Sequence, residues 1–145
     1  MTYFSDNTLL IRDMKPEDAN IFYNTYLSYG WHPSLETYTN YFKEQTENTR
    51  KVFIAEYKGE VAGLCTLVLE PTDGPFAQTG YPEIVDFTVF FHLHKKGIGS
   101  KLLDVVESEA GKFADTIYLA VGLHSGYGAA QKIYAKRGYI PDGSG

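Results

Sequence analysis

The sequence predicts an α/β protein built around a mixed β-sheet. Two apolar segments joined by a short polar turn occur early in the chain and predict an antiparallel hairpin. Later, apolar segments of strand length alternate with amphipathic helical patterns, which is typical of strands that are joined through helices. The 145 residues contain no repeat, low-complexity tract or linker, so we expect one domain that spans residues 1–145.

The N-terminal third is expected to fold as one strand followed by two helices. The apolar run TLLIRDM predicts a strand over residues 8–14. A helix is expected over residues 15–30, because Pro16 and acidic residues stand near its start and apolar residues recur at helical spacing. A second helix is expected over residues 34–48, where Ser34 can occupy the N-cap position.

The hairpin is expected next, with strands over residues 51–57 and 60–70 joined by Lys58 and Gly59. Both strands carry apolar residues on both faces, so the sheet is expected to be covered on both sides. Cys65 lies inside the second strand and is expected to be a core residue rather than a nucleophile.

The second half of the chain alternates between strands and helices. A loop is expected over residues 70–82 from its Gly, Pro and Asp content, and a strand over residues 83–91. An amphipathic helix is expected from Ile98 onward, then a strand over residues 116–122 and a helix over residues 126–139.

Composition narrows the class of function. The net charge of −5 argues against nucleic acid or an anionic membrane as the main partner. Aromatic residues make up 15% of the chain, which indicates an aromatic-lined pocket. The N-terminus lacks the basic and apolar segments of a signal peptide, and the single cysteine allows no internal disulfide. A reducing, cytoplasmic location is therefore expected.

A cationic, glycine-containing turn precedes the helix that begins at Ile98. Gly97 and Gly99 would bring free backbone N–H groups and the positive helix end to one spot, which can bind an anion such as a diphosphate. Lys95 and Lys96 add positive charge there. Taken alone, this stretch is equally compatible with a plain tight turn.

Two other readings of this stretch are disfavoured. His92 and His94 could face one side, but no further ligand stands at suitable spacing, so no metal site is expected. A nucleotide-binding phosphate loop would place a lysine directly after the glycines, whereas here Ser100 precedes Lys101.

The runs IVDFTVFFHLHKKGIGSKLLDVVE and IYLAVGLHSGYGAAQKIYAKRGYIPDG resemble motifs A and B of the GNAT superfamily of acyl-CoA-dependent N-acetyltransferases. In motif A a strand leads to Arg or Gln, two residues, Gly, one residue, Gly or Ala, and a helix, which here falls on residues 94–99. Motif B contains an Ala, a Tyr four residues later, and then Gly and an aromatic residue, here Ala130, Tyr134, Gly138 and Tyr139. The resemblance covers nearly the whole chain and implies a GNAT-like acyl-CoA N-acyltransferase fold.

This resemblance implies acetyl-CoA as the acyl donor. Its pantetheine arm would lie beside the strand over residues 83–91 like an added strand, and the amides of the glycine turn would receive its diphosphate. His94 replaces the usual Arg or Gln, and Tyr127 replaces an Asn that is often found there. The expected cofactor-binding residues are Val89, Phe90, Phe91, His94, Lys95, Lys96, Gly97, Ile98, Gly99, Ser100, Tyr127 and Ala130.

Acetyl transfer to an amine needs two proton transfers. The amine, with a pKa of roughly 10.4, must lose a proton, and the thiolate leaving group must gain one. By the resemblance Tyr134 is the general acid, whereas its alternative is a core tyrosine on an amphipathic helix. Asp86 and Glu83 are candidate bases, and a surface carboxylate is the alternative for each. Strict alternation puts them on opposite faces of their strand, and a bulge would change that.

The amine acceptor is expected to bind near the first two helices, as it usually does in the family. Tyr29, Trp31, His32 and Tyr38 could stack on an amine or bind it by cation–π contact, or they could simply pack the helices together. A primary amine of a small molecule or peptide is the expected acceptor, attacking directly in a ternary complex. The alternative is a catalytically silent acyl-CoA-binding or regulatory module.

The C-terminal residues lack a clear final strand. The family usually follows motif B with two antiparallel strands; Tyr139 and Ile140 can begin the first, but residues 141–145 have loop composition. The fold is therefore expected to lack its last C-terminal strand, leaving an open sheet edge. Either the chain is shorter than its relatives or a partner chain covers this edge, a homodimer being the simplest form.

Overall fold

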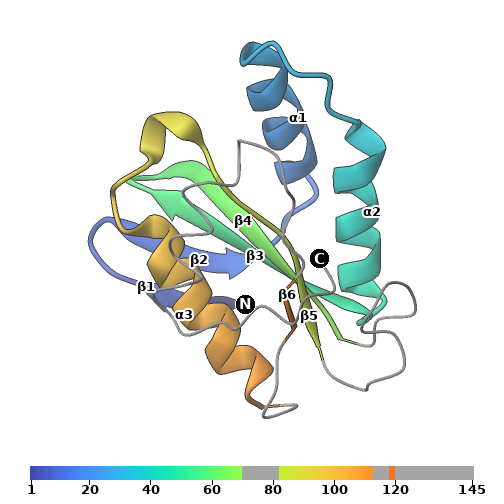
Figure 1. Cartoon of the computed structure of the whole chain (residues 1–145), viewed down its shortest axis with the longest axis vertical. Helices are drawn as coiled ribbons and strands as arrows, with labels where there is room; N and C mark the ends of the chain where they lie inside the picture. Colours follow the sequence, from blue (N-terminus) through green and yellow to red (C-terminus); the bar gives the residue numbers. More distant parts are fainter. Residues whose placement is uncertain (70–81, 113–117, 120–145) are drawn as a thin grey trace.

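The structure is a computed structural model that describes residues 1–69, 82–112 and 118–119 (Figure 1). Its sheet has six strands in the order β1-β2-β3-β4-β5-β6. The strands from β1 to β5 pair antiparallel and β6 pairs parallel to β5, so the predicted mixed sheet is confirmed. The elements in chain order are β1 (Thr2–Ser5), β2 (Leu9–Asp13), α1 (Asp18–Ser28), α2 (Leu35–Thr46), β3 (Arg50–Tyr57), β4 (Glu60–Val68), β5 (Glu83–Val89), the 3-10 turn η1 (Phe91–Leu93), α3 (Ile98–Ala110) and β6 (Tyr118–Leu119).

Helices cover both faces of the sheet. Helix α3 lies on one face, and α1 and α2 lie on the other (Figure 1). The α3 side buries an apolar core that includes Cys65, Leu102 and Val106, while the α1–α2 side buries an aromatic core that includes Phe22 and Phe90. The predicted coverage on both sides, and the core position of Cys65, are therefore confirmed.

The first strand was not predicted from the sequence. Strand β1 is short and exposed at both ends, so it lacks the apolar run that marks the other strands. It pairs with β2, and the Tyr3 hydroxyl donates a hydrogen bond of 2.5 Å to Asp13 Oδ1. The predicted helix over residues 126–139 and the expected open edge after Tyr139 lie outside the described residues.

A buried ion pair fixes the start of α1. The guanidinium of Arg12 on β2 donates two hydrogen bonds to the Asp18 carboxylate, at 2.8 and 3.1 Å, and Asp18 also accepts the Lys15 amide at 2.7 Å. Arg12 donates a further hydrogen bond of 2.5 Å to Glu56 on β3. Bidentate pairing of this kind has a defined geometry, so it sets the direction in which α1 leaves the sheet.

Strand β5 contains a β-bulge at Asp86. Cys65 of β4 pairs with Phe87, but the next residue, Thr66, pairs with Val85, so Asp86 is an extra residue. Asp86 has a φ of 63°, a left-handed conformation that Asp tolerates better than most side chains. The bulge shifts the alternation by one, so Glu83 and Asp86 project to the same face of the sheet.

Gly63 on β4 allows the close approach of β5 just beyond this bulge. A Cβ at this position would lie 2.4 Å from the Thr88 carbonyl oxygen.

We expect Gly63→Ala to lower the free energy of unfolding by about 1–3 kcal/mol, because β5 must move to relieve the overlap. Urea unfolding measures the change. Gly111→Ala at the end of α3, where the nearest atom is 3.4 Å away, is the matched control and is expected to be nearly neutral. Equal midpoints for the two variants would contradict this account.

Candidate active site

Within the described residues, the outer edge of β5 has a partner strand only at its first two residues. It pairs with β6 only at Glu83 and Ile84, and no described residue pairs with the following part of β5 on that side. The resemblance to the family predicts that the pantetheine arm lies along this edge as an added strand, and that prediction remains untested.

The glycine turn follows at the end of β5. Lys95 and Gly97 have φ values of 65° and 78°, and this left-handed pair reverses the chain into α3. The first hydrogen bond of α3 joins Lys101 N to Gly97 O, so the amides of Ile98 and Gly99 point toward the turn. A Cβ at Gly97 would meet no atom of the described residues within 4 Å, so nothing described there blocks the approach of an anion to the helix amides.

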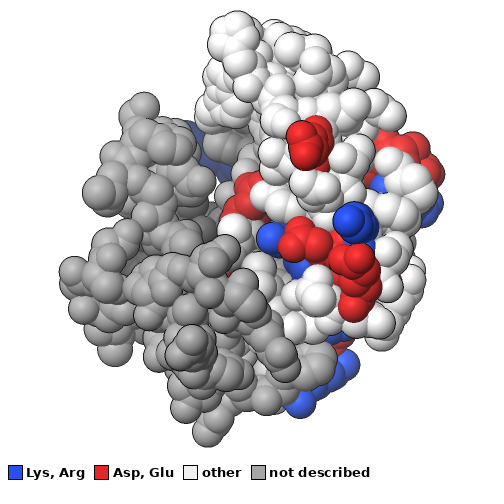
Figure 2. Space-filling view, turned by 90° about the vertical axis from the view of Figure 1, so that its right-hand side faces the viewer, with Lys and Arg blue, Asp and Glu red and all other residues white. Residues whose placement is uncertain are grey.

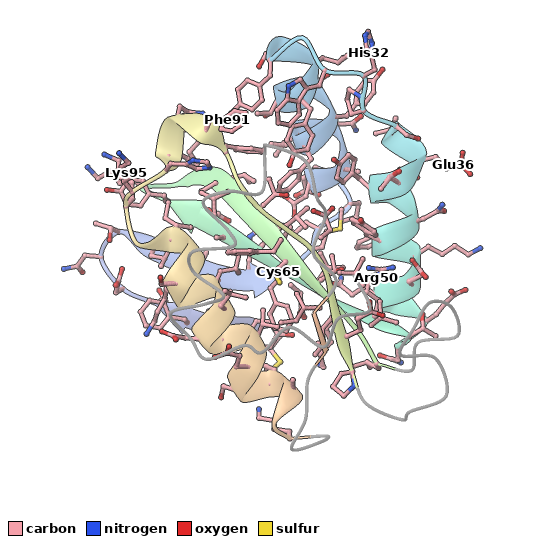
Figure 3. All side chains as sticks on the ribbon, viewed as in Figure 1. His32, Glu36, Arg50, Cys65, Phe91 and Lys95 are labelled. Atoms are coloured by element: carbon pink, nitrogen blue, oxygen red, sulfur yellow. The ribbon has the colours of Figure 1, made fainter. Side chains whose placement is uncertain are left out.

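The side chains around this turn have distinct environments. The His94 ring lies with Nε2 2.7 Å from the Val89 carbonyl oxygen, so it closes the turn from inside. Phe90 is buried against α1, and only its backbone can contact a cofactor. Phe91, by contrast, is 49% exposed, and Lys95 extends from the other side of the turn into solvent (Figure 3).

The two candidate bases lie together on the α1–α2 side of β5. Asp86 accepts a hydrogen bond from the Tyr41 hydroxyl of α2 at 2.9 Å and another from Thr88 at 3.0 Å. These two donors hold the Asp86 carboxylate in one orientation at the bulge. Neither Tyr41 nor Thr88 was identified from the sequence, although Tyr41 stands one helical turn after Tyr38.

Glu83 has a different environment. It is buried, and this burial raises the pKa of its carboxyl group, while the charge of Arg50 acts in the opposite direction. Arg50 projects between α2 and the sheet (Figure 3) and lies over the Tyr41 ring, 4.5 Å from its centre. Its guanidinium donates to Thr66 Oγ1 at 2.6 Å and lies 3.3 Å from Glu44. The carboxylates thus occupy two different electrostatic settings on one face.

The residues proposed to bind the acceptor occupy three different positions. Tyr38 is buried and stacks on Phe22 at 5.7 Å, so it belongs to the helix core. Trp31 and Tyr29 are at the outer end of α1, in contact with each other and with Phe91. His32 points outward from the loop between α1 and α2, away from the sheet (Figure 3).

Tyrosine hydroxyls line the inner part of this face. Burial raises the pKa of Tyr38 to about 12 and raises the pKa values of Tyr26 and Tyr41 further, with the negative charge of Asp86 adding to each shift. These hydroxyls therefore remain protonated over the physiological range and act as hydrogen-bond donors and acceptors rather than as bases.

Three predicted residues, Tyr127, Ala130 and Tyr134, lie outside the described residues. In the described part of the chain, no three His, Cys, Asp or Glu side chains gather closely enough to hold a metal ion. No helix within residues 1–69 or 82–112 is long and apolar enough to cross a membrane. Burial raises the pKa of the Cys65 thiol well above its ordinary value, so it is a poor nucleophile.

The comparison with protein families identifies the class. The model of the GNAT acetyltransferase family matches residues 17–139, which include the glycine turn and both candidate bases, so the chain belongs to this family. The predicted fold and the predicted acyl donor, acetyl-CoA, are those of the family. No curated protein matches the sequence.

Solved structures of distant relatives share the fold. An acetyltransferase from Salmonella typhimurium that modifies the N-terminal serine of ribosomal protein L7/L12 is 13% identical with a TM-score of 0.76, over 99% of this chain and 87% of that one. An N-acetyltransferase from Staphylococcus aureus Mu50 is 23% identical with a TM-score of 0.73, over 94% and 86%. A predicted acetyltransferase from Clostridium acetobutylicum, solved with acetyl-CoA, is 16% identical with a TM-score of 0.67, over 94% and 93%.

The raised pKa of Glu83 predicts a pH-dependent stability. The carboxyl group of Glu83 binds its proton more tightly in the folded protein than in the unfolded chain. Ionisation of Glu83 at a pH above its folded pKa therefore lowers the free energy of unfolding. This loss of stability disappears below the ordinary pKa of 4.5, where the carboxyl group is protonated in both states. We expect Glu83→Gln to raise the melting temperature at pH 7–8, with the gain fading as the pH falls to 4. Thermal melts across pH measure it, with exposed Glu47→Gln as the control. A loss of stability at pH 7 would mean that the attraction to Arg50 outweighs burial.

Proposed function

We propose that this protein transfers the acetyl group of acetyl-CoA to a primary amine of a small molecule or peptide. One observation carries the proposal: β5 leads from the bulge carboxylate Asp86 to the glycine turn before α3, and among the described residues no strand pairs with its outer edge beyond Ile84. A thioester held along this edge would lie beside a proton acceptor at one end and an anion-binding turn at the other. The acceptor would approach from the α1–α2 side, where both carboxylates project.

The residues present suit acetyl-CoA. From Val85 onward no described strand pairs with the outer edge of β5, which could therefore bind the amide groups of the pantetheine arm. The turn around Gly97 offers helix amides and the charges of Lys95 and Lys96 for the diphosphate, with no described atom where a Gly97 Cβ would stand. The His94 ring is hydrogen-bonded to the Val89 carbonyl oxygen, so we assign His94 a role in shaping the turn. Diphosphate binding is then assigned to backbone groups of the turn.

Acetyl-CoA supplies a thioester, and in the transfer a C–N bond forms to the amine while the C–S bond breaks. Asp86 accepts the proton that the amine loses, directly or through a water molecule. Its two hydroxyl donors, Tyr41 and Thr88, keep one carboxylate oxygen lone pair directed at the incoming amine. Tyr134, which matches the motif B tyrosine, returns a proton to the departing sulfur.

A peptide or protein α-amine is one acceptor class that the relatives suggest, because the Salmonella typhimurium enzyme modifies an N-terminal serine. The direct test is release of the CoA thiol from acetyl-CoA across a panel of amines and short peptides, with product masses recorded. Acetylated products at a rate above the hydrolysis of acetyl-CoA alone support the proposal. Tight binding of acetyl-CoA with no acetylated product would favour a silent acyl-CoA-binding module instead.

The cofactor site can be tested with two substitutions of Gly97 that differ from each other mainly in charge. Asp and Asn both tolerate the left-handed conformation of Gly97 and have nearly the same shape. We expect Gly97→Asp to weaken acetyl-CoA binding at least tenfold more than Gly97→Asn, because only Asp places a negative charge against the diphosphate. Calorimetric titration measures both affinities. Equal affinities in the two folded variants would place the diphosphate elsewhere.

The general base is tested by the pH dependence of the rate. Asp86→Asn preserves the bulge, since Asn also enters the left-handed region, but removes the proton acceptor. We expect kcat/KM to fall by about 10²-fold, most strongly at low pH, where the amine is mostly protonated. Exposed Asp104→Asn on α3 is the control. A loss that is the same at every pH would argue against proton abstraction by Asp86.

The general acid is tested by removing one hydroxyl group. Tyr134→Phe should lower kcat by about 10²-fold while the affinity for acetyl-CoA changes little, because the phenol proton is needed only by the departing thiolate. Single-turnover rates and calorimetry measure the two effects separately. Turnover near the wild-type value with a good acceptor would make Tyr134 a packing residue.

A further inference from the structure

Helix α1 and the first two turns of α2, on the acceptor side of β5, carry no Lys or Arg, and Lys43 is the first basic residue of α2. Between Lys15 and Lys43 the sequence contains no Lys or Arg, although this segment supplies all of α1 and most of α2. The upper part of the side shown in Figure 2 is mostly white, with red patches among the white side chains. A positively charged acceptor therefore meets no like charge from α1 or from the first two turns of α2.

Three aromatic rings form an exposed cluster at the outer end of α1. Tyr29, Trp31 and Phe91 lie with ring centroids 5.3 to 5.4 Å apart, and Tyr26 stacks under the Trp31 indole at 5.2 Å. Trp31 is 45% exposed and Phe91 is 49% exposed. Rings of this size are seldom left open on a surface without a partner, and exposed aromatic faces attract ammonium and guanidinium groups.

A carboxylate lies beside the aromatic cluster. Glu60, at the start of β4, has Oε1 3.7 Å from His92 Nε2, and the other ring nitrogen of His92 is 3.1 Å from the Tyr29 hydroxyl. The Glu60 charge contributes to the raised pKa of Tyr29, after burial of the phenol. Aromatic rings next to an exposed carboxylate suit a cation better than a neutral apolar group, because only the cation gains from the charge.

We propose that Tyr29, Trp31, Phe91 and Glu60 form a subsite for a second positive charge on the acceptor, distinct from the amine that is acetylated. The inference rests on the proposed function, whose reacting amine lies near Asp86. Asp86 and Phe91 are five residues apart, so their Cα atoms are at most about 18 Å apart, and the two charges on the acceptor are separated by a distance of that order. The preferred acceptors are then peptides or linear amines that carry a cationic group within that reach.

Arg50, a basic group on this side of the sheet, is already paired with other side chains. Arg50 lies 3.3 Å from the Glu44 carboxylate, donates to Thr66 and interacts with Glu83. Lys95 and Lys96 are on the cofactor side of the turn, where the diphosphate is expected. An acidic acceptor would find no free cation among these groups, so acceptor selection follows charge as well as shape.

The test compares three peptide amides that share an N-terminal serine and differ only in the fourth side chain: lysine, norleucine or glutamate. We expect kcat/KM to be at least about 5-fold higher for the lysine peptide than for the norleucine peptide, and lowest for glutamate. The lysine advantage should shrink when the salt concentration is raised from 50 to 300 mM, because Glu60 is exposed.

Matched variants separate the subsite from general packing. Trp31→Ala and Glu60→Gln should each reduce the lysine advantage to about 2-fold or less, with acetyl-CoA affinity unchanged. Leu27→Ala removes another exposed apolar side chain of α1, and Glu47→Gln removes another exposed charge, and both should keep the advantage. Equal use of the lysine and norleucine peptides by the wild type, or an equal loss for all peptides in Trp31→Ala, would overturn the proposal.

Binding can be observed without turnover. Trp31 is the only tryptophan in the chain, so its fluorescence reports directly on the subsite. Titration with the lysine peptide in the presence of CoA should change the emission at concentrations at which the norleucine peptide has no effect. A selective change without any acetylated product would leave the subsite standing and refute the proposed reaction. An unchanged emission would refute the subsite, whatever the turnover.

Discussion

The arrangement of the active face depends on one extra residue in β5. Because Asp86 is inserted opposite the Cys65–Thr66 step, Phe87 and Ile84 both project into the α3 core, while Glu83 and Asp86 both project toward α1 and α2. A regular strand would bury one carboxylate against α3, which would be costly without a partner. The bulge therefore makes it possible for a buried strand to carry two carboxylates on the acceptor side and apolar residues on the other.

The bulge can direct both carboxylates toward a binding site only if α1 and α2 are held in fixed positions on that face of the sheet. The Arg12–Asp18 pair fixes the start of α1, and the Gln45 side chain makes two hydrogen bonds with the backbone of Met14, at 3.1 and 3.0 Å, which fix the end of α2. Tyr41 is one helical turn before Gln45, and its hydroxyl reaches Asp86 from there. These two sets of polar interactions, made by residues in β2 and directly after it, thus position Tyr41, whose hydroxyl orients the carboxylate of Asp86.

Local patterns in the sequence predicted the elements, whereas contacts between distant residues could not be predicted. Gly97 at the start of α3, the Lys58–Gly59 hairpin and the buried Cys65 each follow from one short motif or apolar run. The four-residue strand β1 has no such run and exists through pairing with β2. The Tyr41–Asp86 hydrogen bond joins residues 45 positions apart, and the bulge interrupts the period-two alternation that places side chains on strand faces. His94 likewise matched a motif position, but its bond to the Val89 carbonyl depends on how the turn closes.

Under the proposed function, the charges along β5 affect product release as well as binding. Lys95, Lys96 and the helix amides after β5 would attract the negative diphosphate, while Asp86 and Glu83 lie on the side where a cationic amine would enter. Under the proposed reaction, acetylation converts an ammonium into a neutral amide. The product then loses its attraction to the carboxylate beside the reaction centre, whereas any second charge keeps its contact at the aromatic cluster. Release of the product is therefore favoured by the chemical step itself, and an acceptor with a strongly held second charge would be released more slowly.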